Sequence, residues 1–234
     1  MLVYLESGAI VVKTIKWRSA FTSLLVFLLA ISITLPYDVM AHEFSPKRYW
    51  NDIYFNSNTK KHIVRLNANI KNVTNTVYNR VLRDAINNWN SFGDGYCNIQ
   101  ITTSDSQLMV YDQYPSTKNQ NAYAVTVSTL SSANIFEYPY GITGGATSIS
   151  CKKITKAKIY VNINKQSANN FNEQDISKTW AHEIGHVMGL NETNDGTRTV
   201  MRQGKGSTFG WSNYWQPQAH DTADLSRYRY VSWS

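Results

Sequence analysis

The 234-residue chain lacks clusters of basic residues, internal repeats, low-complexity linkers and a recognisable calcium-binding loop. Its net charge is +7, but the 23 Lys and Arg residues are scattered, and no expected helix carries a stripe of them. Proteins that bind nucleic acid usually concentrate positive charge on one face or helix, so the sequence argues against such a partner. Aspartates such as Asp94, Asp105 and Asp112 stand far apart, so no sequence motif supports calcium as a cofactor.

Cysteine is scarce, since Cys97 and Cys151 are the only two in the chain. In an exported protein, two cysteines are compatible with one disulfide, and two buried thiols are the alternative. Because the next feature of the sequence indicates export, we expect Cys97 and Cys151 to form a disulfide.

Long hydrophobic runs are absent apart from one stretch at 20–35, AFTSLLVFLLAISITL. Basic residues precede it and small residues follow at 39–41, which is the order of a secretory signal peptide. The stretch is short and rich in Ser and Thr for a membrane-spanning helix. We therefore expect residues 1–41 to be removed and the protein to be secreted, without stable membrane association; an anchored protein is the alternative. Synthesis that begins near Val11 or Val12 would give a signal peptide of more usual length.

Hydrophobic periodicity predicts an α+β domain over 62–234, preceded by an irregular arm at 42–61. An amphipathic helix is expected at 72–93. A second helix begins near Asn172 or Asp175, either of which can cap it, and stops at Gly189. The other expected elements are strands at 62–70, 97–103, 122–128 and 157–164, an extended segment at 138–151, and a short C-terminal helix at 221–230.

The segment AHEIGHVMGLNETNDGTRTVMRQG, residues 181–204, carries the chemistry. His182 and His186 are one helical turn apart, so both imidazoles project from one face and can chelate one zinc ion. Glu183 then lies beside the open coordination position, where it can take a proton from water and pass it to a leaving amine. Apolar residues surround the motif, as in a buried helix, and Gly189 lets the chain turn back. Because so short a motif also arises by chance, two surface histidines are the alternative.

The sequence HEIGHVMGLNE followed by TVM resembles the signature of the metzincin clan of zinc endopeptidases, H-E-x-x-H-x-x-G-x-x-H plus a Met-turn. Over about residues 175–230 the chain is most similar to matrixin-like bacterial secreted proteases. The resemblance implies a metzincin-like zincin fold, with a twisted mixed sheet, two main helices including the active-site helix, a Met-turn and a short C-terminal helix. It further implies that His182 and His186 bind one catalytic Zn²⁺, that Glu183 is the general base, and that Met201 forms the floor of the site.

The resemblance also implies that an extended substrate pairs with the edge of a strand near the active-site helix. Tyr140 to Ser150 is the candidate for this strand. Trp211, Tyr214 and Trp215 are candidates for the wall of a specificity pocket, and membership of the core is the alternative for them.

The chain departs from the clan at Glu192, which stands where the third histidine is expected. A carboxylate oxygen is a normal zinc ligand, and the snapalysins, a small secreted branch of the clan, are similar in using an aspartate there. We therefore expect Glu192 to complete the site. The alternatives are His220, Asp221 or Asp224 as the third ligand, although both aspartates also suit the start of the last helix. A solvated Glu192 beside an incomplete site is a further alternative.

Two smaller departures concern the oxyanion and latency. Gln203 stands where several metzincins have a tyrosine that supports the oxyanion, so it is a candidate for a weaker hydrogen bond. The arm at 42–61 has no cysteine and is too short for a folded prodomain, so we expect no cysteine-switch latency.

These features predict a monomeric, secreted, zinc-dependent endopeptidase whose partners are protein or peptide substrates. The alternative is a non-catalytic secreted binding protein on a metzincin scaffold, its metal site degraded at Glu192. Glu183 favours the enzyme, because a scaffold without catalysis has no chemical need for a carboxylate beside two histidines at ligand spacing.

Overall fold

A computed structural model describes residues 2–6, 9–13, 48–50, 53–59, 61–92, 95–137, 147–193, 198–202, 214–226 and 231–233. The chain divides into two units, Met1–Val39 and Met40–Ser234. In the first unit, strand β1 (Leu2–Glu6) pairs antiparallel with β2 (Ala9–Lys13). The apolar stretch expected to belong to a signal peptide lies outside the described residues, so that expectation stays a prediction. None of the helices in the described part of the chain is long and apolar enough to cross a membrane.

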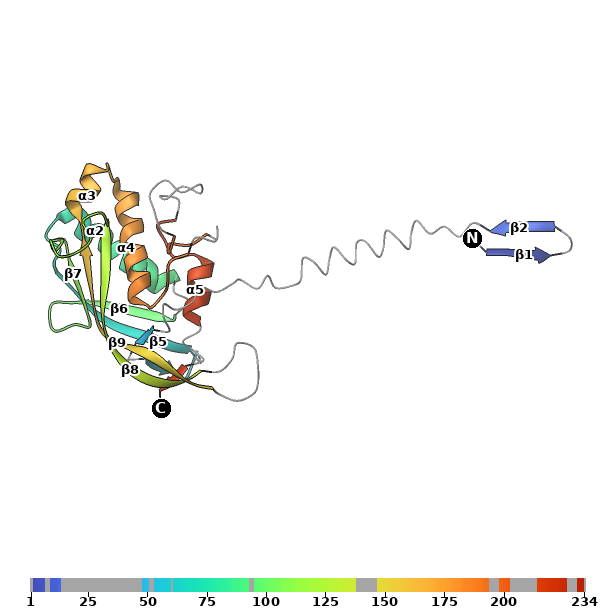
Figure 1. The fold of residues 1–234 in the computed structure, drawn as a ribbon, viewed down its shortest axis with the longest axis horizontal. Coiled ribbons are helices and arrows are strands. Elements are labelled where there is room, and N and C mark those ends of the chain that lie inside the picture. The colour runs from blue at the N-terminus through green and yellow to red at the C-terminus, as the bar shows by residue number, and fades with distance from the viewer. Residues whose placement is uncertain are drawn as a thin grey trace. The chain divides into compact units, whose positions relative to one another are not determined.

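The second unit is built on one mixed sheet (Figure 1), to which eight of the described strands belong. The central strands β5, β7 and β9 run parallel to one another, while β8 is antiparallel to β9 along its whole length. Strands β6 and β4 both pair with β5, β3 pairs with β9, and β10 pairs with the end of β8. The strands are β3 (Arg48–Trp50), β4 (Ile53–Asn56), β5 (Lys61–Asn72), β6 (Cys97–Thr102), β7 (Leu108–Tyr111), β8 (Ala124–Glu137), β9 (Thr147–Val161) and β10 (Val231–Trp233).

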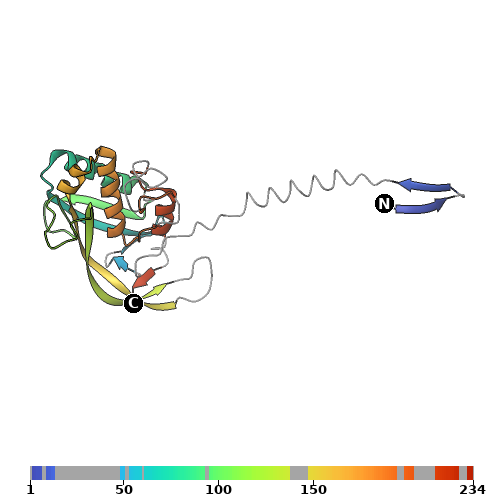
Figure 2. The same ribbon diagram turned by 45° about the horizontal axis from the view of Figure 1, so that its top comes forward.

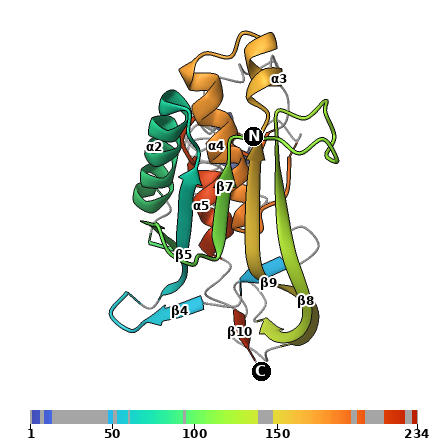
Figure 3. The same cartoon turned by 90° about the vertical axis from the view of Figure 1, so that its left-hand side faces the viewer.

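Helices α2 (Thr76–Phe92) and α4 (Glu173–Val187) lie together behind the sheet in Figure 3. The apolar side chains of α2 recur every three to four residues, so one face is buried. Trp89 on that face donates its indole N–H to Ala181 O of α4, 2.9 Å away. Two shorter helices complete the unit, α3 (Ile163–Ala168) and α5 (Ala219–Leu225), and Figure 2 shows them from a second direction. This is an α+β arrangement with a twisted, open mixed sheet, consistent with the expected metzincin-like zincin fold.

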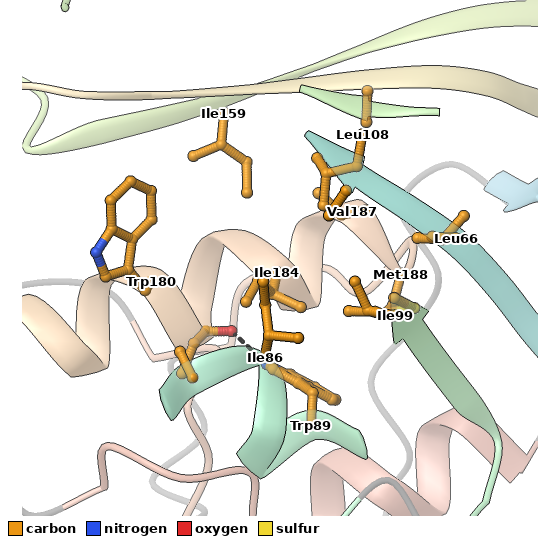
Figure 4. Close-up of a cluster of buried hydrophobic side chains, with 14 of the residues drawn as sticks. Leu66, Ile86, Trp89, Ile99, Leu108, Ile159, Trp180, Ile184, Val187 and Met188 are labelled. Carbon is orange, nitrogen blue, oxygen red and sulfur yellow. Dashed lines mark hydrogen bonds between the residues drawn. The ribbon is translucent and has the colours of Figure 1, made fainter. Parts of the chain in front are cut away.

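The core lies between these helices and the sheet (Figure 4). Trp180 and Ile184 of α4 face Ile159 and Leu108 of the strands, and all four side chains are fully buried. Helix α4, which carries the H-E-x-x-H motif, is therefore held on its apolar face by the sheet.

One expectation about the elements is wrong, and two expected strands prove to be longer than predicted. The stretch at 42–61 is not an irregular arm, because it contributes β3 and β4 to the sheet. Trp50 of β3 is buried and donates its indole N–H to Val187 O, 2.6 Å away. The strands at 122–128 and 157–164 are parts of the much longer β8 and β9, which form one hairpin.

The expected disulfide is also wrong, because Cys97 and Cys151 are not bonded to each other. Cys97 begins β6 opposite Val64, whereas Cys151 lies on β9 opposite Ala133 of β8. The Cys97 thiol instead donates a hydrogen bond to Trp89 O, 3.0 Å away. Burial raises the pKa of this thiol to about 12. The two cysteines are thus placed as buried side chains of separate strands.

Candidate metal centre

The N-terminal cap of α4 fixes where the H-E-x-x-H motif lies on the helix. The side chain of Asn172 accepts a hydrogen bond from Asp175 N at 3.0 Å, and Asp175 Oδ2 accepts one from Asn172 N at 3.1 Å. This reciprocal pair satisfies two backbone N–H groups of the first turn. Two turns later, His182 and His186 occupy the same side of the helix, with ring centroids 4.6 Å apart.

Backbone carbonyls orient both histidines. His182 Nδ1 lies 2.9 Å from Val200 O, and His186 Nδ1 lies 2.9 Å from Leu190 O. A carbonyl oxygen only accepts, so Nδ1 carries the proton in each ring and Nε2 keeps its lone pair. This is the tautomer that a metal ligand needs, and the second hydrogen bond holds the ring in place.

The Glu192 carboxylate faces these two nitrogens. Its Oε1 lies 4.0 Å from His182 Nε2 and 3.7 Å from His186 Nε2. The three donor atoms all lie within 4.8 Å of one another, and no other His, Cys, Asp and Glu group in the described residues is placed to share an ion. Both distances to Oε1 are within twice a typical zinc–ligand bond of about 2.0–2.2 Å, so the residues present fit a zinc ion.

Burial controls the charges at the centre. It lowers the pKa of His182 well below the usual imidazole value, and the neighbouring His186 lowers it further. Burial would also lower the pKa of His186, but the carboxylates of Glu192 and Glu183 outweigh burial and raise it. Burial raises the pKa of Glu183 as well, which makes its carboxylate more basic than one in water. His182 is therefore neutral at neutral pH, as a ligand must be.

Glu183 lies at a cleft between α4 and β8. The cleft has a volume of about 260 Å³ and is lined by the start of β8, by Glu183 and His186, and by residues 189–192. Glu183 is only 5% exposed, and its Oε2 lies 2.6 Å from the hydroxyl of Thr126 on β8. The chain turns away at Gly189, whose φ of 90° is a left-handed conformation that glycine adopts without a steric penalty.

A short segment around Met201 lies beneath the helix. A Cβ atom placed on Gly185 would overlap the Met201 sulfur, so the methionine packs directly against the motif. Met201 N donates a hydrogen bond to Thr199 Oγ1 at 2.9 Å, and Met201 O accepts one from Thr193 N at 3.2 Å. The carboxylate of Asp221 accepts from Val200 N at 3.1 Å and from the Thr199 hydroxyl, which ties this segment to α5.

The family model described as metallo-peptidase family M12B, reprolysin-like, matches residues 51–193. The chain belongs to this metallopeptidase family. A search of the curated proteins found no match. Membership in M12B implies a metal, typically zinc, and a protease activity in general. It does not single out a matrixin-like or snapalysin-type protein within the metzincins.

The alternative ligands of this M12B metallopeptidase are not brought to the centre. Asp221 is fully buried and serves as the first-turn acid of α5, where Gln218 N also donates to it. His220 and Asp224 are buried on the same helix and are absent from the three-residue donor group. Gln203, the expected oxyanion support, lies outside the described residues.

The sequence pattern did not single out Thr126, whose hydroxyl contacts the Glu183 carboxylate. Alternation in AYAVTVS does place Thr126 and Ser128 on one face of a strand, and this pattern was the available signal. The alternation does not tell that α4 lies over the face with Thr126 and Ser128.

Proposed function

We propose that this chain is a secreted zinc endopeptidase that hydrolyses peptide bonds in extended polypeptides. The observation that carries the proposal is the convergence of two imidazole nitrogens and the Glu192 carboxylate within 4.8 Å, beside the carboxylate of Glu183. Two histidines and one glutamate are a donor set used by catalytic zinc sites. When bound there, zinc supplies Lewis acidity that polarises a peptide carbonyl and makes a water molecule more acidic.

Glu183 is the general base in this proposal. It takes a proton from the attacking water and passes it to the nitrogen of the leaving amine, so that the carboxylate is regenerated. Its burial supports this role, because the raised pKa brings the carboxyl closer to the pH at which it must both accept and donate. His182 and His186 would hold the ion through Nε2, and the backbone carbonyls at their Nδ1 atoms keep the two rings oriented.

Strand β8 is the proposed binding edge for an extended substrate. From Ala124 to Thr129 it pairs with β9 along one edge, and the described strands leave its other edge unpaired before Ile135. An open strand edge can take an extended peptide as one more strand. The expected strand at 140–150 lies partly outside the described residues, and its described part pairs with the far end of β8. The proposal therefore moves from that segment to β8.

Two finer assignments belong to the same proposal. The carboxylate at Glu192, as in snapalysins, and the Met201 segment tied to α5 by Asp221 favour a matrixin-like, carboxylate-liganded variant of the metzincin site. Secretion and freedom from the membrane rest on the expected signal peptide at 1–41, and monomeric action is part of the same proposal.

The test begins with zinc content per chain after dialysis without chelator. We expect about one zinc per folded chain, and at least about a tenfold loss of zinc affinity in Glu192→Ala. Glu183→Gln should keep zinc and lose peptidase activity by a factor of about 100 or more. Glu173→Gln, an exposed substitution on the same helix, is the matched control and should leave both unchanged.

Two results would reject the proposal. Folded protein that cannot be loaded by added zinc has no metal centre. Zinc-loaded protein that cleaves no peptide would favour the non-catalytic binding scaffold.

A further inference from the structure

Thr126 connects the sheet to the carboxylate of Glu183. It lies on β8 opposite Ile159 of β9, and Ile159 is fully buried under α4. Cross-strand partners point to the same side of a sheet, so the Thr126 side chain also faces α4. Its Oγ1 lies 2.6 Å from Glu183 Oε2 and 3.1 Å from Glu183 O.

The hydroxyl of Thr126 has one proton and two acceptors within reach. It can donate that proton to either Oε2 or the main-chain oxygen of Glu183. The carboxylate is closer, and a hydrogen bond to a charged oxygen is about twice as strong as one between neutral groups. With Oε2 engaged in this way, Oε1 is the carboxylate oxygen left for a water molecule.

Both ends of this hydrogen bond are on rigid elements. β8 is paired with β9 on both sides of Thr126, and Glu183 is inside α4, whose apolar face packs on the sheet. The last torsion of a glutamate is broad and has no strongly preferred value, so the carboxylate plane needs an external partner to fix it. Among the described contacts, Thr126 is the residue whose hydroxyl is hydrogen-bonded to the Glu183 carboxylate.

We propose that Thr126 is a positioning residue that orients the general base. By holding Oε2, its hydroxyl turns Oε1 toward the attacking water, a role that rests on the proposed function of Glu183. The same strand offers its open edge to the substrate, so β8 positions both the peptide to be cut and the base. One rigid strand then fixes the distance between the Glu183 carboxylate and the bound substrate.

Three variants test this role. Thr126→Val keeps the shape and removes the hydroxyl, and Thr126→Ser restores a hydroxyl. Thr103→Val makes the same change at an exposed position outside β8 and is the control. We expect Thr126→Val to lower kcat by a factor of about 10 to 100, because small misplacements of a catalytic group have effects of this size. KM and zinc content should stay within a factor of about two, since neither ligands nor strand edge change. Thr126→Ser should recover most of kcat, and Thr103→Val should match the wild type.

A readout independent of activity is the orientation of Glu183 in crystal structures of the zinc-loaded wild type and Thr126→Val. We expect the carboxylate to rotate or to adopt two conformers in the variant. If Thr126→Val does not fold, Thr126→Ala takes its place in both measurements.

The proposal is overturned if kcat is unchanged without the hydroxyl, if serine does not restore it, or if the Glu183 carboxylate keeps its orientation. A zinc-loaded wild type without peptidase activity would instead reject the proposed function. The crystal structures would then still decide whether Thr126 orients Glu183.

Discussion

Gly185, the fourth residue of the H-E-x-x-H motif, is the position at which one methyl group tests the packing beneath the metal centre. A Cβ there would overlap Met201 Sδ, would lie 3.1 Å from Met201 Cε and would lie 3.4 Å from Trp89 Cζ2. Met201 and Trp89 are both fully buried, so neither can move aside without displacing other core atoms. Gly185→Ala therefore sets helix propensity against packing.

The two effects differ in sign and size. Alanine in place of glycine inside a helix stabilises by about 1 kcal/mol. Extra atoms forced into a packed core destabilise by about 1–3 kcal/mol. Because the overlap is with atoms that are fully buried, we take the upper end and expect a net loss of about 2 kcal/mol in the free energy of unfolding.

Urea unfolding of Gly185→Ala, Met201→Ala and the double variant measures this loss. Met201→Ala alone should destabilise by about 2–5 kcal/mol because it leaves a cavity. In the double variant the new methyl occupies part of that cavity, so we expect the two losses to be less than additive by at least about 1 kcal/mol. The difference in stability between Asn87→Ala and Asn87→Gly, at an exposed position of α2, reports the gain in helix propensity from glycine to alanine alone. The reasoning is refuted if Gly185→Ala is as stable as the wild type, or if the losses simply add.

Two further predictions concern buried titratable side chains. Burial lowers the pKa of Lys178 from its usual 10.5 to about 8, although the nearby Asp221 carboxylate opposes this shift. Between pH 8 and 10.5, the unfolded chain therefore keeps a proton on Lys178 that the folded chain has lost. Wild-type stability should therefore rise relative to Lys178→Met by about 3 kcal/mol between pH 8 and 10.5, as measured by urea unfolding, and a constant difference would contradict the pKa shift. Cys97 and Cys151 should appear in separate peptides when the protein is mapped by mass spectrometry without reduction, and a cross-linked peptide pair would contradict the structure. Cys97 should also resist alkylation until the protein is denatured, because burial raises the pKa of its thiol to about 12.

Local patterns were enough to predict helices α2 and α4, but not α3, whose first two residues were expected to belong to a strand. The four-residue spacing of buried side chains in α2 and the cap at Asn172 are encoded within a few residues. The same holds for His182 and His186, whose common direction follows from helical geometry alone. The placement of Glu192 beside them agrees with the spacing argument, and its role as a ligand stays a prediction.

Non-local placement could not be predicted in the same way. That the start of β8 borders the cleft depends on how the β8–β9 hairpin is registered in the sheet. The expected disulfide was wrong because counting cysteines gives no distance between Cys97 and Cys151. Strand register and helix packing are set by contacts between residues far apart in sequence, and a single sequence does not state them.

The hydrogen bond from His182 to Val200 O means that the helix with the H-E-x-x-H motif does not contain everything that the candidate metal centre needs. Residues 173–193 moved onto another scaffold would carry all three donor side chains. They would leave His182 Nδ1 without its acceptor and Gly185 without the methionine packed beneath it. A working transplant needs the segment at 198–202 as well, together with the Asp221 carboxylate that holds it from α5.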